Sequence, residues 1–199
     1  MSKQDAYLKT IKLAKEKLAG KNLNSICANL GLVNPQNGKL NFRAFGMDMS
    51  LDEHFDIIEA KSGKPAKLGD HILILHYLLY DGLVEPTGQL ITFRDMPGGQ
   101  FYWNPFLSRS INPLLACIGN NVQLLRERIN KFDWKPATGG DFAAAIHAIG
   151  KIDATIVYHL GDDEFGPTAN IMFDSCVKKV FNTEDVAWLA GRICLALLY

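Results

Sequence analysis

The stretch from Asp70 to Gly82 constrains the fold of this chain more than any other. Every residue from Ile72 to Tyr80 is apolar or aromatic except His76. A helix that is apolar around its whole circumference is buried on all sides instead of lying on the surface. Asp70 is suited to cap the start of such a helix, and Gly82 is suited to end it in the left-handed conformation. At about 1.5 Å per residue a helix from Asp70 to Asp81 would be about 18 Å long, which is too short to cross a bilayer. We therefore expect a helix buried in a protein core.

The other segments predict a mixture of helices and strands. Apolar residues at helical spacing, or capping residues before an apolar run, predict helices at residues 4–18, 22–30, 121–132 and from 183 onward. Short alternating or β-branched runs predict strands at residues 39–49, 54–60, 89–94, 154–159 and 169–173. Residues 100–120 contain two prolines and predict two short helical pieces, whereas residues 142–149 are compatible with a helix or a strand. Because helices and strands do not alternate regularly, we predict a single α+β domain over residues 1–199. Its antiparallel sheet packs against the buried central helix and flanking helices.

The composition is that of a folded protein and excludes several functional classes. Of the 199 residues, 48% are hydrophobic and 21% are charged, which argues against long disordered segments. Basic and acidic residues both number 21, so no basic excess indicates nucleic-acid binding. Met1 is followed by polar residues and not by the apolar core of a signal peptide, so we expect a cytoplasmic protein that does not use the membrane. We expect the cysteines, which form no Cys-x-x-Cys pair, to be buried thiols: Cys27, Cys117, Cys176 and Cys194.

The most unusual segment, residues 91–106, follows the predicted core helix. Gly98 and Gly99 allow the backbone to approach a ligand closely, and the guanidinium group of Arg94 suits a carboxylate or phosphate. An aromatic cluster directly after the glycines would form a wall for a flat, largely apolar ligand; it includes Tyr102, Trp103 and Phe106. The alternative is an Arg94–Asp95 surface pair before an ordinary turn, with the aromatic residues packed in the core.

His76 is a further candidate because it interrupts the apolar run from Ile72 to Tyr80. An imidazole there could be an axial ligand of a metal or a buried base. The alternative is a structural histidine whose nitrogen meets a backbone carbonyl or a tyrosine hydroxyl. His71 lies about 140° around the helix from His76, so the two rings would not share one metal.

Three consecutive carboxylates, Asp162, Asp163 and Glu164, form the other notable group. They would attract a hard cation, but they lack the alternating ligand spacing of a calcium-binding loop. We therefore predict a solvent-exposed hairpin tip without a tightly bound metal. No Ser-His-Asp, Cys-His or His-Glu-x-x-His arrangement in the sequence identifies catalytic residues.

Several motifs in a fixed order resemble one family. They are Leu75-His76-Tyr77-Leu78, Pro86-Thr87-Gly88, Phe93-Arg94-Asp95-x-Pro97-Gly98-Gly99, Gly161-Asp-Asp-Glu-Phe165, Ile171-Met-Phe-Asp174 and Thr183-Glu-Asp185. Over roughly residues 5–198 the chain resembles an uncharacterised prokaryotic family, domain of unknown function 3786, found in anaerobic bacteria and archaea. The resemblance implies a context of corrinoid-dependent methyl transfer and the acetyl-CoA pathway. Some members carry a cysteine-rich iron–sulfur module, which this chain lacks.

These observations give one main hypothesis and two alternatives. The main hypothesis is a cytoplasmic small-molecule or cofactor-binding protein in anaerobic one-carbon metabolism. Its ligand would be a corrinoid or related tetrapyrrole, and its partners would be corrinoid-pathway proteins. Its site would comprise His76, Arg94, Gly98, Gly99, Tyr102, Trp103 and Phe106. The alternatives are a hydrolase or lyase that uses the Asp162–Glu164 turn, with Asp174 nearby, and a structural or scaffolding subunit. Whether the protein is an enzyme stays open at this point.

Overall fold

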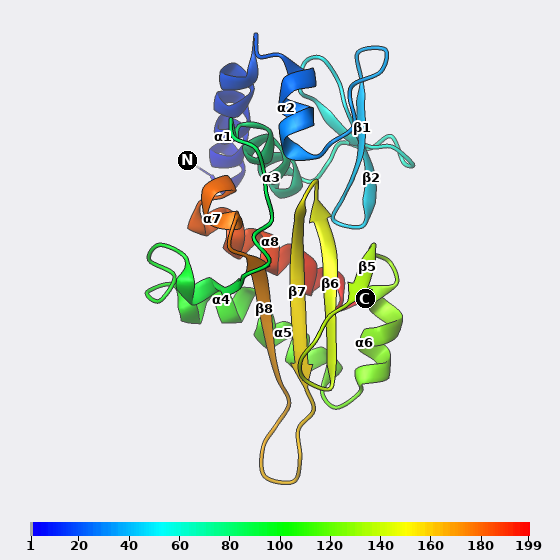
Figure 1. The fold of residues 1–199 in the computed structure, drawn as a ribbon, viewed down its shortest axis with the longest axis vertical. Coiled ribbons are helices and arrows are strands. Elements are labelled where there is room, and N and C mark those ends of the chain that lie inside the picture. The colour runs from blue at the N-terminus through cyan, green and yellow to red at the C-terminus, as the bar shows by residue number, and fades with distance from the viewer. Residues whose placement is uncertain (1) are drawn as a thin grey trace.

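The computed structural model describes residues 2–199 and shows an α+β fold built on an antiparallel sheet (Figure 1). The strands of these residues are β1 (Leu40–Ala44), β2 (Met47–Leu51), β3 (Ile57–Glu59), β4 (Leu90–Thr92), β5 (Trp134–Pro136), β6 (Phe142–Ile149), β7 (Ile152–His159) and β8 (Thr168–Asp174). The helices are α1 (Lys3–Leu18), α2 (Leu23–Leu30), α3 (Leu68–Leu78), α4 (Trp103–Arg109), α5 (Ile111–Ile118), α6 (Val122–Ile129), α7 (Val177–Val180) and α8 (Thr183–Ala196). The predicted fold class is confirmed.

The sheet consists of two groups of strands that meet at a narrow seam (Figure 1). Its strand order is β3-β2-β1-β6-β7-β8-β4, and β5 pairs with β6 outside this path. At the seam, β1 faces β6 through one residue pair, Ala44 opposite Ile149. The Phe45 N–H adds a hydrogen bond to the Ala148 carbonyl at 2.8 Å. Helices α1 to α3 accompany the β1–β3 group, and α4 to α6 accompany the β5–β8 group.

One face of the β6–β7–β8 meander is buried in the core. Ala144, Ile156 and Ile171 stand opposite one another in register and are fully buried. Helices α5 and α8 lie behind these strands in Figure 1, and they pack against each other there. The buried face of α8 includes Val186 and Leu189. Alternation along the strands thus points every second side chain at the helices.

Helix α3 is the buried helix that the apolar stretch predicts, and it packs against α1, α2 and α8. Its side chains are buried except for His76 and the N-terminal Leu68. Gly69 permits the close approach of α8, because a Cβ atom there would lie 2.2 Å from the Trp188 ring. Burial on several sides agrees with the absence of a polar face in the sequence.

The predicted ends of this helix are wrong. Asp70 lies inside α3 and not at its N-cap, which is Lys67 without a side-chain cap. The reason is that the Asp70 carboxylate accepts from Nε of Arg192 on α8, at 2.8 and 3.0 Å to its two oxygens. The helix ends at Leu78, with Leu79 as its C-cap, so Gly82 lies beyond it and is not among the glycines with positive φ.

Two predicted strands differ from the observed ones. Residues 39–49 contain two strands, because Phe45 and Gly46 adopt φ values of 53° and 76° and turn the chain into a hairpin. Strand β4 ends at Thr92, since the Asp95 carboxylate accepts from the N–H and Oγ1 of Thr92, both at 2.8 Å, and closes a 3₁₀ turn. Arg94 therefore lies in a turn and not on a strand.

The helical predictions need smaller changes. The break within residues 100–120 falls at Ser110, and both prolines sit in the first turns of α4 and α5, where a missing N–H is tolerated. The cap of α8 is Asn182 and not Thr183, since the Asn182 side chain accepts from the Asp185 N–H at 2.9 Å. The ambiguous residues 142–149 form β6.

The cysteines do not share one environment. Cys27, Cys176 and Cys194 are buried, as expected, but Cys117 is exposed on α5. The prediction fails there because Cys117 lies on the outward side of a short amphipathic helix, whose buried face is formed by Ile111, Leu114 and Ile118.

Candidate functional site

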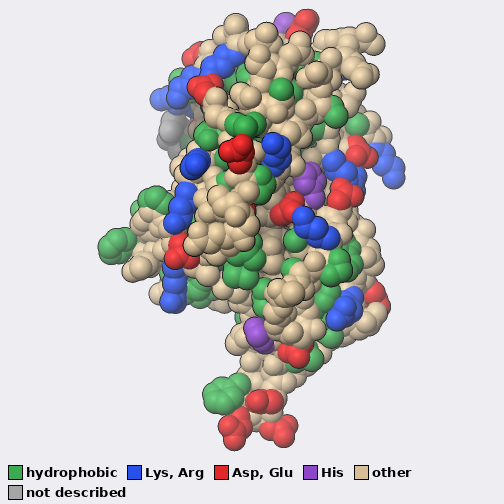
Figure 2. Space-filling view, viewed as in Figure 1, with side chains coloured by type: hydrophobic (Ala, Val, Ile, Leu, Met, Phe, Trp, Pro, Cys, Tyr) green, Lys and Arg blue, Asp and Glu red, His purple; other side chains and the backbone are tan. Residues whose placement is uncertain are grey.

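The acidic turn forms the tip of the long β7–β8 hairpin and projects from the body of the molecule. Acidic side chains gather at this tip in Figure 2, and Asp162, Asp163 and Glu164 are all exposed. Asp162 accepts from the N–H groups of Glu164 and Phe165 at 2.9 and 2.7 Å, so it stabilises the turn itself. The predicted exposure is confirmed. Among residues 2–199, no three His, Cys, Asp or Glu side chains come together as a possible metal site.

Asp174 does not join the acidic turn. Its carboxylate accepts from the N–H groups of Thr87 and Gly88 at 3.0 and 2.7 Å and from the Cys176 N–H at 2.9 Å. Desolvation works to raise the pKa of Asp174, but these hydrogen bonds outweigh it and lower that pKa to about 2. The residue therefore fastens the loop before β4 to the end of β8.

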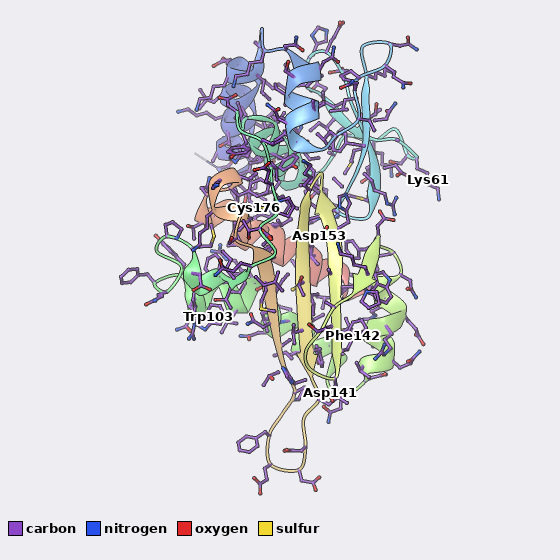
Figure 3. The ribbon with its side chains drawn as sticks, in the orientation of Figure 1. Lys61, Trp103, Asp141, Phe142, Asp153 and Cys176 are labelled. Atoms are coloured by element: carbon purple, nitrogen blue, oxygen red, sulfur yellow. The ribbon has the colours of Figure 1, made fainter. Side chains whose placement is uncertain are left out.

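The aromatic segment forms a stack with its own residues. Phe93 and Phe106 have ring centroids 4.2 Å apart and nearly parallel planes, and Trp103 stacks on Phe106 at 5.3 Å. The Arg94 guanidinium carbon lies 4.4 Å from the Trp103 ring centroid. Trp103 stands at the start of α4 (Figure 3). Because Phe106 is only 2% exposed, it offers no open ring face to a ligand.

The two glycines serve a tight turn of the backbone. Gly98 has φ of 72°, and a Cβ atom on Gly99 would lie 2.0 Å from the Phe93 carbonyl oxygen. The turn directs the next two aromatic side chains outward, where Phe101 is 90% exposed and Tyr102 is 61% exposed. The structure thus brings Arg94, Trp103 and Phe106 together but sends Tyr102 elsewhere.

His76 pairs with Asp185, a residue that the sequence analysis did not connect with it. The His76 Nδ1 atom lies 2.9 and 3.0 Å from the two Asp185 carboxylate oxygens. Asp185 is buried, and the His76 side chain is 24% exposed. A carboxylate that fixes one imidazole nitrogen is the usual support of a histidine whose other nitrogen binds a metal or carries a proton. No local pattern could reveal this pair, because 109 residues separate its members.

His76 and the aromatic segment lie on different sides of the first turn of α8. Thr183 in that turn donates from Oγ1 to the Pro97 carbonyl at 2.7 Å, whereas Asp185 faces His76. In the part of the chain that the structure describes, the hydrogen bonds, ion pairs and ring contacts of His76 include no residue of 91–106. The predicted site residues therefore occupy two separate environments.

A groove of about 690 Å³ runs along α8. Its floor is one face of α8, with Ala187, Trp188 and Gly191 near the middle. Four further lining residues also belong to α8: Glu184, Arg192, Leu195 and Ala196. The others come from α1, the N-cap of α3, α4 and the C-terminal residue: Lys3, Tyr7, Lys67, Arg109 and Tyr199. We call this cavity the α8 groove. The volume lies within the range of ordinary small-molecule sites.

Aromatic and charged side chains give the α8 groove its character. The rings of Tyr7 and Trp188 lie 5.0 Å apart with a tilt of 49°, and Lys3 Nζ lies 5.6 Å from the Tyr7 ring centroid. Arg192 is held by the buried Asp70. Burial raises the pKa of Asp70, although Arg192 and Lys67 partly oppose this effect. The groove can therefore hold a flat apolar group beside fixed positive charge.

The α8 groove could not be predicted from the sequence, because each contributing segment looks ordinary by itself. The only available signal was the outer face of the last helix, where Ala187, Trp188, Gly191 and Leu195 recur at helical spacing.

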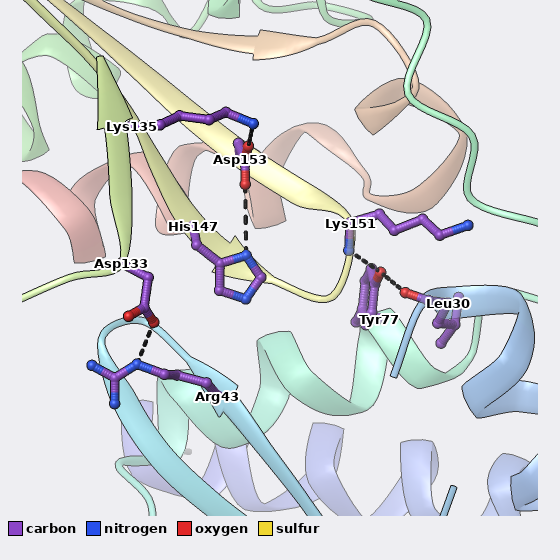
Figure 4. A network of polar contacts seen from close by, with 8 residues as sticks. All are labelled: Leu30, Arg43, Tyr77, Asp133, Lys135, His147, Lys151 and Asp153. Atoms are coloured by element: carbon purple, nitrogen blue, oxygen red, sulfur yellow. Dashed lines mark hydrogen bonds and ion pairs between the residues drawn. The ribbon is translucent and has the colours of Figure 1, made fainter. Parts of the chain in front are cut away.

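The polar network around Asp153 has a structural role (Figure 4). Asp153 lies 3.1 Å from Lys135 Nζ and 3.6 Å from His147 Nδ1, which links β5, β6 and β7. The His147 hydrogen bond and the Lys135 charge lower the pKa of Asp153. Arg43 pairs with Asp133 across the seam.

Comparison with protein families supplies one match. The family model described as a domain of unknown function, DUF3786, matches residues 22–196. The chain belongs to this family. The match includes the α8 floor of the groove, whereas Lys3 and Tyr7 of this DUF3786 protein lie before it. No curated protein and no solved structure is similar enough to the chain to count as a match. No helix within residues 2–199 is long and apolar enough to cross a membrane.

Proposed function

We propose that this DUF3786 protein binds a small molecule or cofactor in the α8 groove. The observation that carries the proposal is the groove itself, with about 690 Å³ of space over the open face of a core helix. Binding sites for small molecules are concave, mostly apolar and bordered by a few polar groups. The rings of Tyr7 and Trp188, beside the small residues Ala187 and Gly191, suit a flat apolar ligand.

The narrower proposal is a corrinoid or related tetrapyrrole. The lining residues suit the outer parts of such a group, since Trp188 would pack on the macrocycle and Lys67 would bind an acidic substituent. The lining residues within the described chain include no His, Cys or Met, so the groove supplies no such axial ligand to a central metal. We further propose, from the family resemblance, that the protein acts in the cytoplasm in anaerobic one-carbon metabolism with corrinoid-pathway proteins.

The test is titration of the purified protein with haem and with cobalamin, prepared anaerobically and followed by absorbance and tryptophan fluorescence. Ala187→Phe fills the groove, and we expect it to weaken binding of the ligand at least about tenfold, or about 1.4 kcal/mol. Ala116→Phe on the exposed side of α5 is the matched control and should leave affinity unchanged. Binding of haem or cobalamin that Ala187→Phe does not weaken would place the ligand outside the groove. A colourless protein that binds neither compound would remove the tetrapyrrole proposal.

One alternative gains support from a specific observation. Phe101 and Tyr102 are exposed on the loop before α4, and adjacent exposed aromatic residues are typical of protein contacts. We propose a scaffolding role as the second candidate function. Self-association or retention of a corrinoid-pathway protein that Phe101→Ser abolishes would support it. The hydrolase or lyase alternative gains no such support. The acidic turn is solvent-exposed, and the Asp174 carboxylate already accepts hydrogen bonds from the N–H groups of Thr87 and Gly88.

A further inference from the structure

We infer that the ligand of the α8 groove carries an anionic group, a carboxylate or a phosphate, bound by Arg192 and Lys67 at the end of the groove nearest α3. This inference rests on the proposed function, because it names the chemical class of the molecule that the same groove takes.

The first argument is a local excess of positive charge. The groove is lined by Lys3, Lys67, Arg109 and Arg192 but by one acidic side chain, Glu184. Arg109 pairs with Glu184 at 3.5 Å and Arg192 pairs with Asp70 at 2.8 Å, so the excess comes from Lys3 and Lys67. Within residues 2–199, Lys3 and Lys67 have no carboxylate within 4.0 Å. Since the whole chain has equal numbers of basic and acidic residues, the excess is a property of this surface and would attract anions.

The second argument is the way in which Arg192 is held. Its Nε atom donates to both oxygens of Asp70, and its Nη2 atom lies 3.8 Å from the Met47 sulfur. A guanidinium group has five N–H donors, and Nη1 of Arg192 makes no hydrogen bond to any described residue. Asp70 is thus a positioning residue that fixes the guanidinium while leaving donors for a ligand.

Burial strengthens this arrangement. The Arg192 side chain is 16% exposed and Asp70 is 2% exposed, so an anion at Nη1 would interact with less screening than at a surface arginine. The planar guanidinium fits carboxylates and phosphates, and a fixed donor loses little freedom when it binds. Lys67, exposed at the start of α3, adds a second charge at the same end of the groove.

The apolar floor defines the rest of the ligand. Trp188 and Tyr7 provide aromatic surface, and the small side chain of Ala187 leaves room above α8. The expected ligand therefore combines a flat, largely apolar body with at least one carboxylate or phosphate. A neutral molecule of the same shape would bind through the floor alone.

Two fluorescent dyes test this difference directly. Anilinonaphthalene sulfonate has a flat aromatic body with one negative charge, and phenylnaphthylamine has the same body without the charge. We expect the charged dye to bind the folded protein at least about tenfold more tightly, and to lose that advantage as salt rises from about 0.05 M to about 0.5 M. Ala187→Phe should weaken both dyes, because it fills the floor that they share.

The decisive variant is Lys67→Glu, since Lys67 is exposed and its side chain makes no capping hydrogen bond to α3. We expect it to weaken the charged dye about tenfold and the neutral dye less than about twofold. Lys64→Glu makes the same change of charge at an exposed position that does not line the groove, and should affect neither dye. Arg192→Lys, which keeps the charge beside Asp70, should weaken only the charged dye.

The outcomes separate the two proposals. If Ala187→Phe leaves both dyes unaffected, or neither dye binds, the groove is not a ligand site and the proposed function fails. If both dyes bind in the groove with equal affinity and Lys67→Glu changes neither, the anionic inference alone is overturned. Displacement of the charged dye by inorganic phosphate but not by acetate, at matched ionic strength, would identify a phosphate group, and the reverse would identify a carboxylate.

Discussion

Replacement of Tyr77 by phenylalanine should destabilise the protein strongly, although it removes a single oxygen atom. The Tyr77 hydroxyl donates to the Leu30 carbonyl at 2.6 Å and accepts from the Lys151 N–H at 3.1 Å, which ties the end of α2 to the β6–β7 turn (Figure 4). Burial raises the pKa of Tyr77 to about 12, so the hydroxyl keeps its proton at neutral pH. A Cβ atom on Gly150 would lie 2.2 Å from the hydroxyl, which leaves no room for a replacement water.

The expected loss follows from two backbone groups left without a partner. Each buried unsatisfied group costs about 1–3 kcal/mol, and the Lys151 N–H is only partly buried, so we expect a loss of about 2–4 kcal/mol. For a chain of this size that lowers Tm by about 4–16 °C. Urea unfolding should show a lower midpoint with an unchanged slope.

Tyr80→Phe is the matched control. Tyr80 is half-buried in the same region, and its hydroxyl makes no hydrogen bond to any residue that the structure describes. The control should change the unfolding free energy by less than about 0.5 kcal/mol. Equal, small effects of both variants would refute the argument that the Tyr77 hydroxyl joins the two parts of the fold.

Further predictions concern other sites. Asp174 has a lowered pKa, so it stabilises the folded state above the ordinary value of 3.8, and this contribution is lost as pH falls towards 2. After allowance for solvent screening we expect about 1 kcal/mol, which Asp174→Asn should abolish in urea unfolding compared at pH 5 and pH 2.5. His76→Gln should leave dye binding in the groove within about twofold, because His76 does not line it; lost binding with a normal Tm would place His76 in the site. One thiol, Cys117, should react rapidly with a disulfide reagent in the folded protein and all four after denaturation, since burial raises the pKa values of the others to about 11 or 12. Metal analysis of the native protein should return no near-stoichiometric zinc, manganese or iron, and a positive result lost in Asp163→Ala would contradict our interpretation of the acidic turn.

Burial of the central helix could be predicted because its cause is local. Nearly every side chain from Ile72 to Tyr80 is apolar, so no face of that helix suits water. Its ends could not be predicted in the same way. Asp70 has the sequence context of a capping residue, but its carboxylate accepts a hydrogen bond from Arg192, which lies 122 positions later in the chain.

The candidate site was less predictable than the fold for the same reason. The aromatic residues after Gly99 suggested a ligand wall, but Phe93, from the neighbouring turn, stacks on Phe106 and helps bury it. In contrast, Trp188 and Lys67 belong to no sequence motif. They line the same groove only because α8 packs against the start of α3. The groove depends on which segments meet, and that information is spread over the whole chain.

The packing of α3 against α8 also determines when the fold can be completed during protein synthesis. Arg192 follows Asp70 by 122 residues, and at about 5–20 residues per second a ribosome needs about 6–24 s to add them. During that time α1 and α2 can already cover part of α3, but the side that receives Trp188 and Arg192 is still exposed to water. The final helix therefore completes the core, and a nascent chain stalled before it would present the apolar surface that chaperones recognise.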